Sequence, residues 1–93
     1  MKDKSENEIE KLSDLPNIGP EVERQLNQVG IFTYENLKTM GAQQAWLQIQ
    51  QIDSSACIHR LLALEGAIRG VKKSQLPIDV KERLKEFYHW NRK

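Results

Sequence analysis

The chain has 93 residues, of which 39% are hydrophobic and 29% charged, and these values are typical of one soluble globular domain rather than a disordered segment. No apolar run approaches the ~20 residues that a helix needs to cross a bilayer, and the polar start MKDKSENEIE predicts no secretory signal peptide. Cys57 is the single cysteine, which excludes an internal disulfide, and we therefore expect a cytoplasmic protein.

Helical patterns fill the chain, and no segment alternates between polar and apolar residues for long enough to predict a strand. Residues 1–10 are predicted to form a polar extension, and residues 11–93 a single domain. A first short helix should place the apolar residues of 9–15 on one face. It should end before Pro16, because the residue before a proline is pushed out of the helical region.

A second helix should begin at Pro20, since proline costs nothing at the first helical position. It should end at Gly30 in the left-handed conformation, with Ile31 making the hydrophobic contact beyond the end. Thr33 is a suitable cap for a third helix, and Gly41 should end it.

A fourth helix is predicted from Ala42, with an apolar face that includes Trp46 and Ile49. Its polar side is rich in glutamine: Gln43, Gln44, Gln48, Gln50 and Gln51.

The cluster at residues 53–55 is predicted to cap a fifth helix, near residues 55–69, which Gly70 should close. This helix is apolar around most of its circumference, so it belongs in the middle of a bundle. Pro77 opens a sixth helix with an apolar stripe at Val80, Leu84 and Phe87. The sequence thus predicts an all-α fold, a compact array of five to six short helices around the fifth.

The segment LPNIGP, residues 15–20, suggests a tight turn between two helices, and such turns grip phosphate in some nucleic-acid-binding proteins. The contact would be made by Asn17, Ile18 and Gly19. The carboxylates of Glu21 and Glu23 follow at once and oppose a bound phosphate. We therefore prefer the interpretation that the hairpin sets the angle between helices, and keep phosphate binding as the alternative.

Positive charge gathers toward the C-terminus. Residues 71–93 hold seven basic and three acidic residues, a balance of +4, whereas residues 1–30 hold four basic and seven acidic, a balance of −3. The candidate basic patch consists of Lys72, Lys73, Lys81, Lys85, Arg92 and Lys93. Strong nucleic-acid binders usually have a pI above ~9, whereas the pI here is 7.9, so a solvated helix face is the preferred interpretation.

Tyr88 and Trp90 stand just beyond the apolar stripe of the sixth helix. Exposed aromatic side chains are enriched at protein interfaces, because they bury a large area at little entropic cost. These two residues are therefore candidates for an interface, and the alternative that Trp90 folds back onto the bundle stays open.

Cys57 and His59 invite a metal or nucleophile interpretation, but residues two apart on a helix point in different directions. The chain also lacks the further cysteine and histidine residues of a zinc set. No phosphate-binding glycine loop or nucleophile motif is present. We predict no catalytic residue, no metal and no cofactor.

Several of these features together resemble the C-terminal domain of the TfoX/Sxy competence regulators, a bacterial family. The resemblance covers nearly the whole chain beyond the first ten residues. It rests on the LPNIGP segment, the series Val29-Gly30-Ile31, Thr33, Leu37 and Gly41-Ala42, the helix at residues 57–70, and then Leu76-Pro77, Lys81, Leu84 and Phe87.

The resemblance implies an all-α fold with a helix-hairpin-helix-like element, related in shape to SAM-type domains. It also implies a non-enzymatic interaction module in competence or transcription regulation, which binds a protein partner or self-associates. The alternative function is a nucleic-acid-binding module that uses the LPNIGP hairpin and the basic C-terminal segment. No membrane or small-molecule substrate is expected as a partner.

Overall fold

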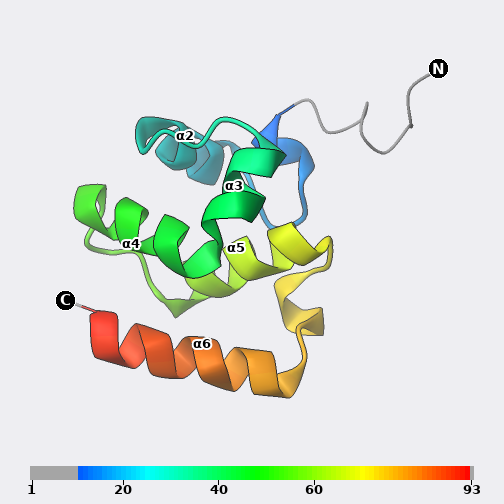
Figure 1. Cartoon of the computed structure of the whole chain (residues 1–93), viewed down its shortest axis with the longest axis vertical. Coiled ribbons are helices and arrows are strands. Elements are labelled where there is room, and N and C mark those ends of the chain that lie inside the picture. Colours follow the sequence, from blue (N-terminus) through cyan, green and yellow to red (C-terminus); the bar gives the residue numbers. More distant parts are fainter. Residues whose placement is uncertain (1–10, 93) are drawn as a thin grey trace.

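A computed structural model describes residues 11–92, and every regular element in that range is helical. Figure 1 shows short helices wrapped around α5, which lies in the middle. The all-α prediction is confirmed. The elements are a 3₁₀ turn η1 (Leu12–Asp14), α2 (Pro20–Gln28), α3 (Tyr34–Met40), α4 (Ala42–Ile52), α5 (Ile58–Arg69), a 3₁₀ turn η2 (Lys73–Gln75) and α6 (Ile78–Asn91).

The first predicted helix is only the turn η1 where the structure describes it, because Pro16 follows closely and prevents a longer helix. Ile9 lies outside the described residues. The main-chain N–H of Lys11 donates to the Asp14 carboxylate at 3.2 Å, which caps the turn. Leu12 is fully buried, so the short turn still anchors the start of the domain to the core.

The predicted end of α2 is confirmed. Gly30 has a φ of +88°, which is the left-handed region that favours glycine. The N–H of Ile31 donates to the Leu26 carbonyl at 2.8 Å, and the N–H of Gly30 to the Asn27 carbonyl at 3.1 Å. This pair of bonds is the Schellman motif, and the Ile31 side chain is fully buried against the helix that it ends.

The predicted cap of the fifth helix is wrong. α5 begins at Ile58 with Cys57 as its N-cap residue, whereas Asp53 ends α4, donating its N–H to the Ile49 carbonyl at 2.8 Å. The Asp53 carboxylate accepts the N–H of Ser55 at 3.0 Å, so it closes a local turn instead of capping the main-chain N–H groups at the start of α5. The central position of α5 is confirmed, since Leu61 and Leu64 are fully buried.

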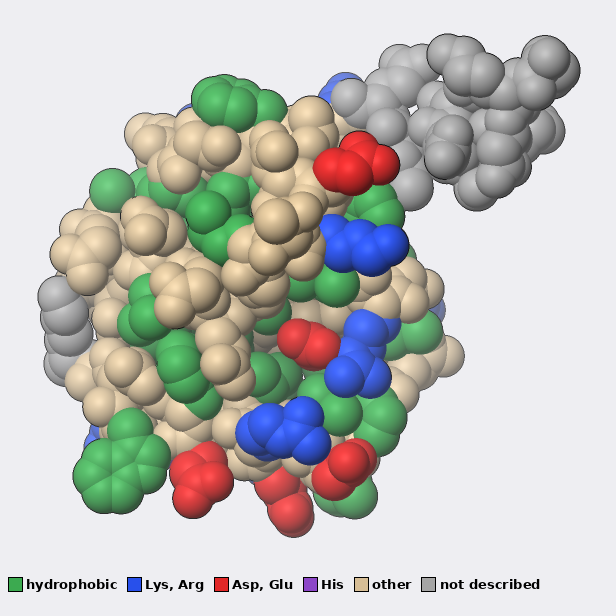
Figure 2. Space-filling view, in the orientation of Figure 1, with side chains coloured by type: hydrophobic (Ala, Val, Ile, Leu, Met, Phe, Trp, Pro, Cys, Tyr) green, Lys and Arg blue, Asp and Glu red, His purple; other side chains and the backbone are tan. Residues whose placement is uncertain are grey.

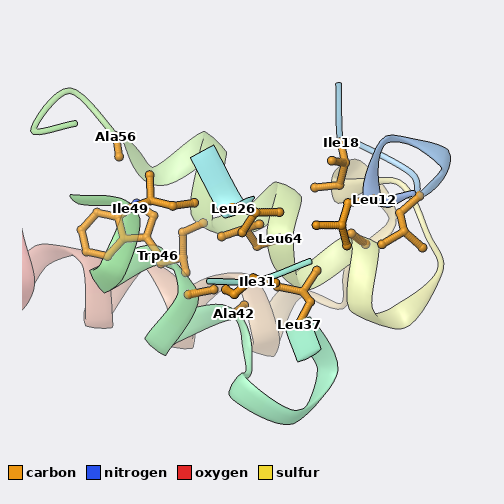
Figure 3. Close-up of a cluster of buried hydrophobic side chains, with 14 of the residues drawn as sticks. Leu12, Ile18, Leu26, Ile31, Leu37, Ala42, Trp46, Ile49, Ala56 and Leu64 are labelled. Carbon is orange, nitrogen blue, oxygen red and sulfur yellow. The ribbon is translucent and has the colours of Figure 1, made fainter. Parts of the chain in front are cut away.

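Trp46 of α4 is fully buried in the core, and Figure 3 shows its ring beside Ile49 among aliphatic side chains from several elements. Its indole N–H donates to the Cys57 carbonyl at 3.3 Å. The ring also meets Phe87 and Tyr88 of α6 edge to face, with centroids 6.2 and 5.5 Å apart. One side chain therefore links α4, the segment before α5, and α6.

α4 and α6 lie side by side and run in the same direction (Figure 1). Trp46 meets Phe87 and Tyr88, and one turn further along α4 the Gln50 side-chain amide donates to the Asn91 carbonyl at 3.1 Å. Leu84 is buried on the inner side of α6, in agreement with the predicted stripe. No helix within residues 11–92 is both long and apolar enough to cross a membrane.

Candidate interaction surfaces

Asn17 of the LPNIGP hairpin is fully engaged by the protein itself. Its φ is +69°, in the left-handed region that asparagine tolerates. The side-chain amide donates to the carbonyls of Val71, at 2.9 Å, and Ala63, at 3.4 Å. The amide oxygen accepts the N–H of Lys73 at 3.1 Å. A ligand at the hairpin would have to do without this side chain or break these bonds.

The other two residues of the predicted hairpin contact differ from each other. The side chain of Ile18 is buried in the core, so it fixes the hairpin and is not available to a ligand. Gly19 is half exposed and is the N-cap residue of α2, with an extended backbone. Glu21 and Glu23 lie in the first turn of α2, and Glu21 pairs with Arg24 at 2.6 Å.

Gly66 of α5 is the position that lets the hairpin approach. A Cβ atom at residue 66 would lie 2.5 Å from the Asn17 amide nitrogen and 2.7 Å from the Val71 carbonyl oxygen. Glycine in a helix interior normally costs stability, and here it leaves room for the asparagine to bond to the backbone at the end of α5. The glycine inside a helical pattern was the only sequence signal for this packing.

The candidate basic patch does not form one surface. Lys72 and Lys73 are exposed beside the hairpin, and the Lys81 ammonium donates to the Ser74 carbonyl at 3.1 Å, which places it beside η2. Lys85 is exposed on α6. Arg92 follows the far end of α6, about 20 Å from the start of that helix at 1.5 Å per residue. Lys93 lies outside the described residues.

Figure 2 shows how charge is distributed on one face of the molecule. Lys and Arg side chains are interspersed with Asp and Glu on the right of this face and along its lower edge. One ion pair in the described structure joins Arg69 to Glu65 at 2.6 Å. Because positive and negative side chains alternate, this surface attracts a polyanion such as DNA only weakly.

A polar cluster joins α2, the end of α4 and α5. The side chain of Gln25 is only 5% exposed. It donates to the Asp53 carboxylate at 2.8 Å and accepts from the Arg60 guanidinium at 2.9 Å. Arg60 also pairs with Asp53 at 3.0 Å. The hydrogen bond from the Ser55 hydroxyl, and then those from Gln25 and Arg60, hold the pKa of the Asp53 carboxyl well below its usual range.

We expect Asp53→Asn to flatten the acid dependence of stability. Because the pKa of Asp53 is lower in the folded chain, its contribution is fully present above the ordinary pKa of 3.8 and is lost as the pH falls toward the lowered value. Urea midpoints at about pH 6 and about pH 3 should therefore differ less in the variant than in the unaltered protein. Glu82→Gln, at an exposed residue of α6, is the control and should keep the original difference. An equal difference between the two urea midpoints in all three proteins would contradict the lowered pKa of Asp53.

Cys57 and His59 are not brought together into a site. Cys57 is half-buried at the start of α5, and His59 is exposed. In the part of the chain that the structure describes, no group of three His, Cys, Asp or Glu side chains is arranged to hold a metal ion.

Tyr88 and Trp90 have different environments, although both are on the last turns of α6. Tyr88 is half-buried and its ring packs against Trp46 of the core. Trp90 is 76% exposed, and its ring meets that of the neighbouring His89, at 5.5 Å between centroids. Trp90 does not fold back onto the bundle.

The exposed surface of α4 carries no charge. Residues 39–52 include no Asp, Glu, Lys or Arg, yet Gln44, Gln48 and Ile52 are exposed. In Figure 2 the left part of the face above its lower edge, over α4, shows mainly hydrophobic and uncharged side chains. A hollow of about 260 Å³ opens at this border, lined by Met40, Gly41, Ala42, Gln43, Gln44, Glu65, Val80, Arg83 and Leu84.

Taken together, residues 11–92 define a small all-helical domain that presents an uncharged face beside an exposed tryptophan. The family model of the TfoX C-terminal domain matches residues 8–88, so the chain belongs to the TfoX C-terminal domain family. Protein Sxy of Escherichia coli (strain K12) is 38% identical over 88 residues. These residues are 94% of this chain but 42% of Sxy, so the chain spans less than half the length of that relative.

Two crystal structures of proteins from Listeria monocytogenes have the same fold. One, in a triclinic form, is described as an uncharacterized protein. It is 42% identical with a TM-score of 0.85, over 86% of this chain and 91% of the other. The second, in a tetragonal form, is described as a protein of unknown function. It is 43% identical with a TM-score of 0.83, over 85% and 96% of the two chains. These similarities support the fold and name no ligand.

Proposed function

We propose that this chain is a non-enzymatic interaction module of the kind used in competence or transcription regulation, and that it works in the cytoplasm by binding another polypeptide. The partner is a different protein or a second copy of the chain. Family membership supports the regulatory role. The observation that carries the proposal is the uncharged surface of α4 beside the exposed ring of Trp90.

The physical basis is the cost of desolvation. Protein interfaces are depleted of charge at their centre, and aromatic residues and methionine are enriched there, because a charged side chain loses hydration when a partner covers it. The exposed α4 surface offers amides and aliphatic groups, and Met40 and Trp90 are both exposed at its borders. A partner can therefore cover the exposed surface of α4 without burying a charged side chain of that helix.

Site-specific photo-crosslinking tests the proposal. A photoreactive side chain at Gln48, exposed on α4, should give covalent adducts with a polypeptide when irradiated in living cells. The matched position is Glu35, exposed on α3, and it should give much weaker adducts. Mass spectrometry would identify the partner. Equal labelling at both positions, or none at Gln48, would argue against an α4 interface.

Nucleic-acid binding is the second candidate, and one contact favours it. The bond between Asn17 and the Lys73 N–H places Lys72 and Lys73 beside the hairpin, so these two candidate elements are neighbours. A phosphate contact at this place requires that affinity fall steeply with salt.

Measuring DNA affinity against salt concentration, for the unaltered chain and for the variant Lys72→Gln/Lys73→Gln, tests this candidate function. For a nucleic-acid module, duplex or single-stranded DNA should bind at low salt, and removing two phosphate contacts should reduce the slope of log K against log[salt] by roughly 2. We expect instead no measurable DNA binding by either protein, because charge of both signs surrounds the hairpin. If log K falls steeply with log[salt] and the double variant reduces that slope, nucleic-acid binding becomes the preferred function over protein binding.

A further inference from the structure

α6 carries a second stripe in addition to the one that faces the core. Asp79, Arg83, Glu86 and Trp90 are separated by four, three and four residues, and all four side chains are exposed. At 3.6 residues per turn they fall within an arc of about 60°. Such spacing brings side chains into one line along a helix, and it is the spacing through which helices pair.

This outer stripe borders the hollow between α4 and α6. Arg83 lines the hollow together with Val80, and Met40 closes its other side. Trp90 lies two turns further along the same stripe, about 10 Å from Arg83 along the helix axis. One surface therefore holds both a protruding aromatic ring and an opening bounded by apolar side chains and a guanidinium.

We propose that a second copy of this chain binds here, with the two α6 helices packed antiparallel about a twofold axis near the midpoint between residues 84 and 85. This proposal rests on the proposed function and names the partner as the chain itself. An isologous contact uses the same patch twice, so the patch must be complementary to itself.

The charges of the stripe satisfy this condition. Two antiparallel helices related by such an axis bring Arg83 of each copy opposite Glu86 of the other, which forms two pairs of opposite charge. The same axis brings Trp90 opposite Asp79, at the level of the hollow in the other copy. There the ring lies over the hollow that Val80 lines and against the Arg83 guanidinium, and its indole N–H meets a carboxylate acceptor. Parallel packing would instead place Arg83 beside Arg83.

The expected strength follows from the size of the contact. A pair of 14-residue helices with the neighbouring edges of α4 corresponds to the small class of interfaces, below about 1,200 Å² in total. We therefore expect a dimer with a dissociation constant on the order of 10 μM, set mainly by the two Trp90 rings.

Sedimentation equilibrium over about 1 to 500 μM, chosen to bracket that constant, tests the proposal with the full chain. The average mass should rise from 10.8 kDa toward twice that value. Trp90→Ala should keep the mass of the monomer over the same range. Ile78→Ala is the matched control, since Ile78 is 74% exposed on the same helix but lies about 120° around it from Trp90, and it should dimerise as the unaltered chain does.

Charge reversal gives the sharper test. Arg83→Glu and Glu86→Arg each place like charges opposite one another, and each should weaken the dimer by about tenfold or more at low salt. The double variant Arg83→Glu/Glu86→Arg restores opposite charges and should regain most of the affinity. Circular dichroism should show unchanged folding, because both residues are exposed.

Three results would overturn the dimer. These are a monomer mass at every concentration, an equal loss in Trp90→Ala and Ile78→Ala, or a double charge variant no better than the single ones. A chain that stays monomeric but still forms adducts with a different protein at Gln48 would refute only this inference. Absence of adducts at Gln48, together with a monomeric chain, would refute the proposed function as well.

Discussion

Trp46→Ala should lower the free energy of unfolding by about 3–5 kcal/mol, the range for removing a buried large aromatic ring. A domain of this length has a total stability of roughly 5–14 kcal/mol, so the substitution should remove at least about a fifth of it. The ring is fully buried, and it contacts Phe87 and Tyr88 as well as the Cys57 carbonyl. Its loss therefore opens a cavity where α4 meets α6.

Chemical unfolding of Trp46→Ala, Trp46→Phe and Trp90→Ala separates the contribution of the buried ring from that of its N–H hydrogen bond and from the effect of losing an exposed tryptophan. Trp90→Ala makes the same change at an exposed site and should alter stability by no more than about 0.5 kcal/mol. Trp46→Phe should cost about 1–2 kcal/mol, because an aromatic ring remains and the Cys57 carbonyl keeps the N–H of Arg60 as a donor. Similar losses in Trp46→Ala and Trp90→Ala would mean that the α4–α6 contact is misplaced.

The helix ends could be predicted wherever they depend on local backbone chemistry. Gly30, Gly41 and Gly70 all have positive φ values, and each stands at the position where a glycine signal was recognised. Proline acted in the same way at the start of α2. These residues constrain the chain by their own covalent structure, so the sequence alone was sufficient.

The start of α5 was missed because a tertiary contact changed the role of a capping residue. Asp53 is of a residue type that often caps helices. Its carboxylate is instead bound by Gln25 and Arg60, which lie 28 and 7 residues away in the chain. The side chain of Asp53 therefore joins α2 to α5 in the polar cluster and does not cap α5. No local pattern could reveal this, since the partners meet only after the helices pack.

The candidate interaction surfaces could be predicted from the sequence only in part. Trp90 was a candidate from its residue type and its place beyond the apolar stripe, but its exposure depends on the side of α6 on which it lies, since Asn91 beyond it still contacts Gln50 of α4. The glutamines of α4 were recognised as a polar side, and the absence of charge over residues 39–52 can be read from the sequence. What could not be read is that this uncharged surface, the hollow and Trp90 share one face, because α4 and α6 become neighbours only in the folded chain.

Gly66→Ala should destabilise the domain by about 1–3 kcal/mol, although alanine is favoured over glycine in a helix by up to about 1 kcal/mol. The added methyl group would lie 2.5 Å from the Asn17 amide nitrogen and 2.7 Å from the Val71 carbonyl oxygen. The side chain of Asn17 can turn away from the added methyl group, but the Val71 carbonyl belongs to the main chain and cannot. The N–H of Val71 also donates to the Gly66 carbonyl at 2.9 Å. Relief therefore requires that the end of α5 open.

A double-mutant cycle with Asn17→Gly tests whether the hairpin and α5 are coupled through this contact. Asn17→Gly keeps the left-handed backbone but removes the bonds to Ala63, Val71 and Lys73, and should itself cost about 1–3 kcal/mol. With the amide gone, Gly66→Ala should be clearly less harmful than in the unaltered chain. Gly19→Ala is the control for glycine replacement, since no atom lies within 4 Å of its added methyl group, and should cost at most about 1 kcal/mol. Additive losses in the cycle would show that Asn17 does not hold the LPNIGP hairpin to α5.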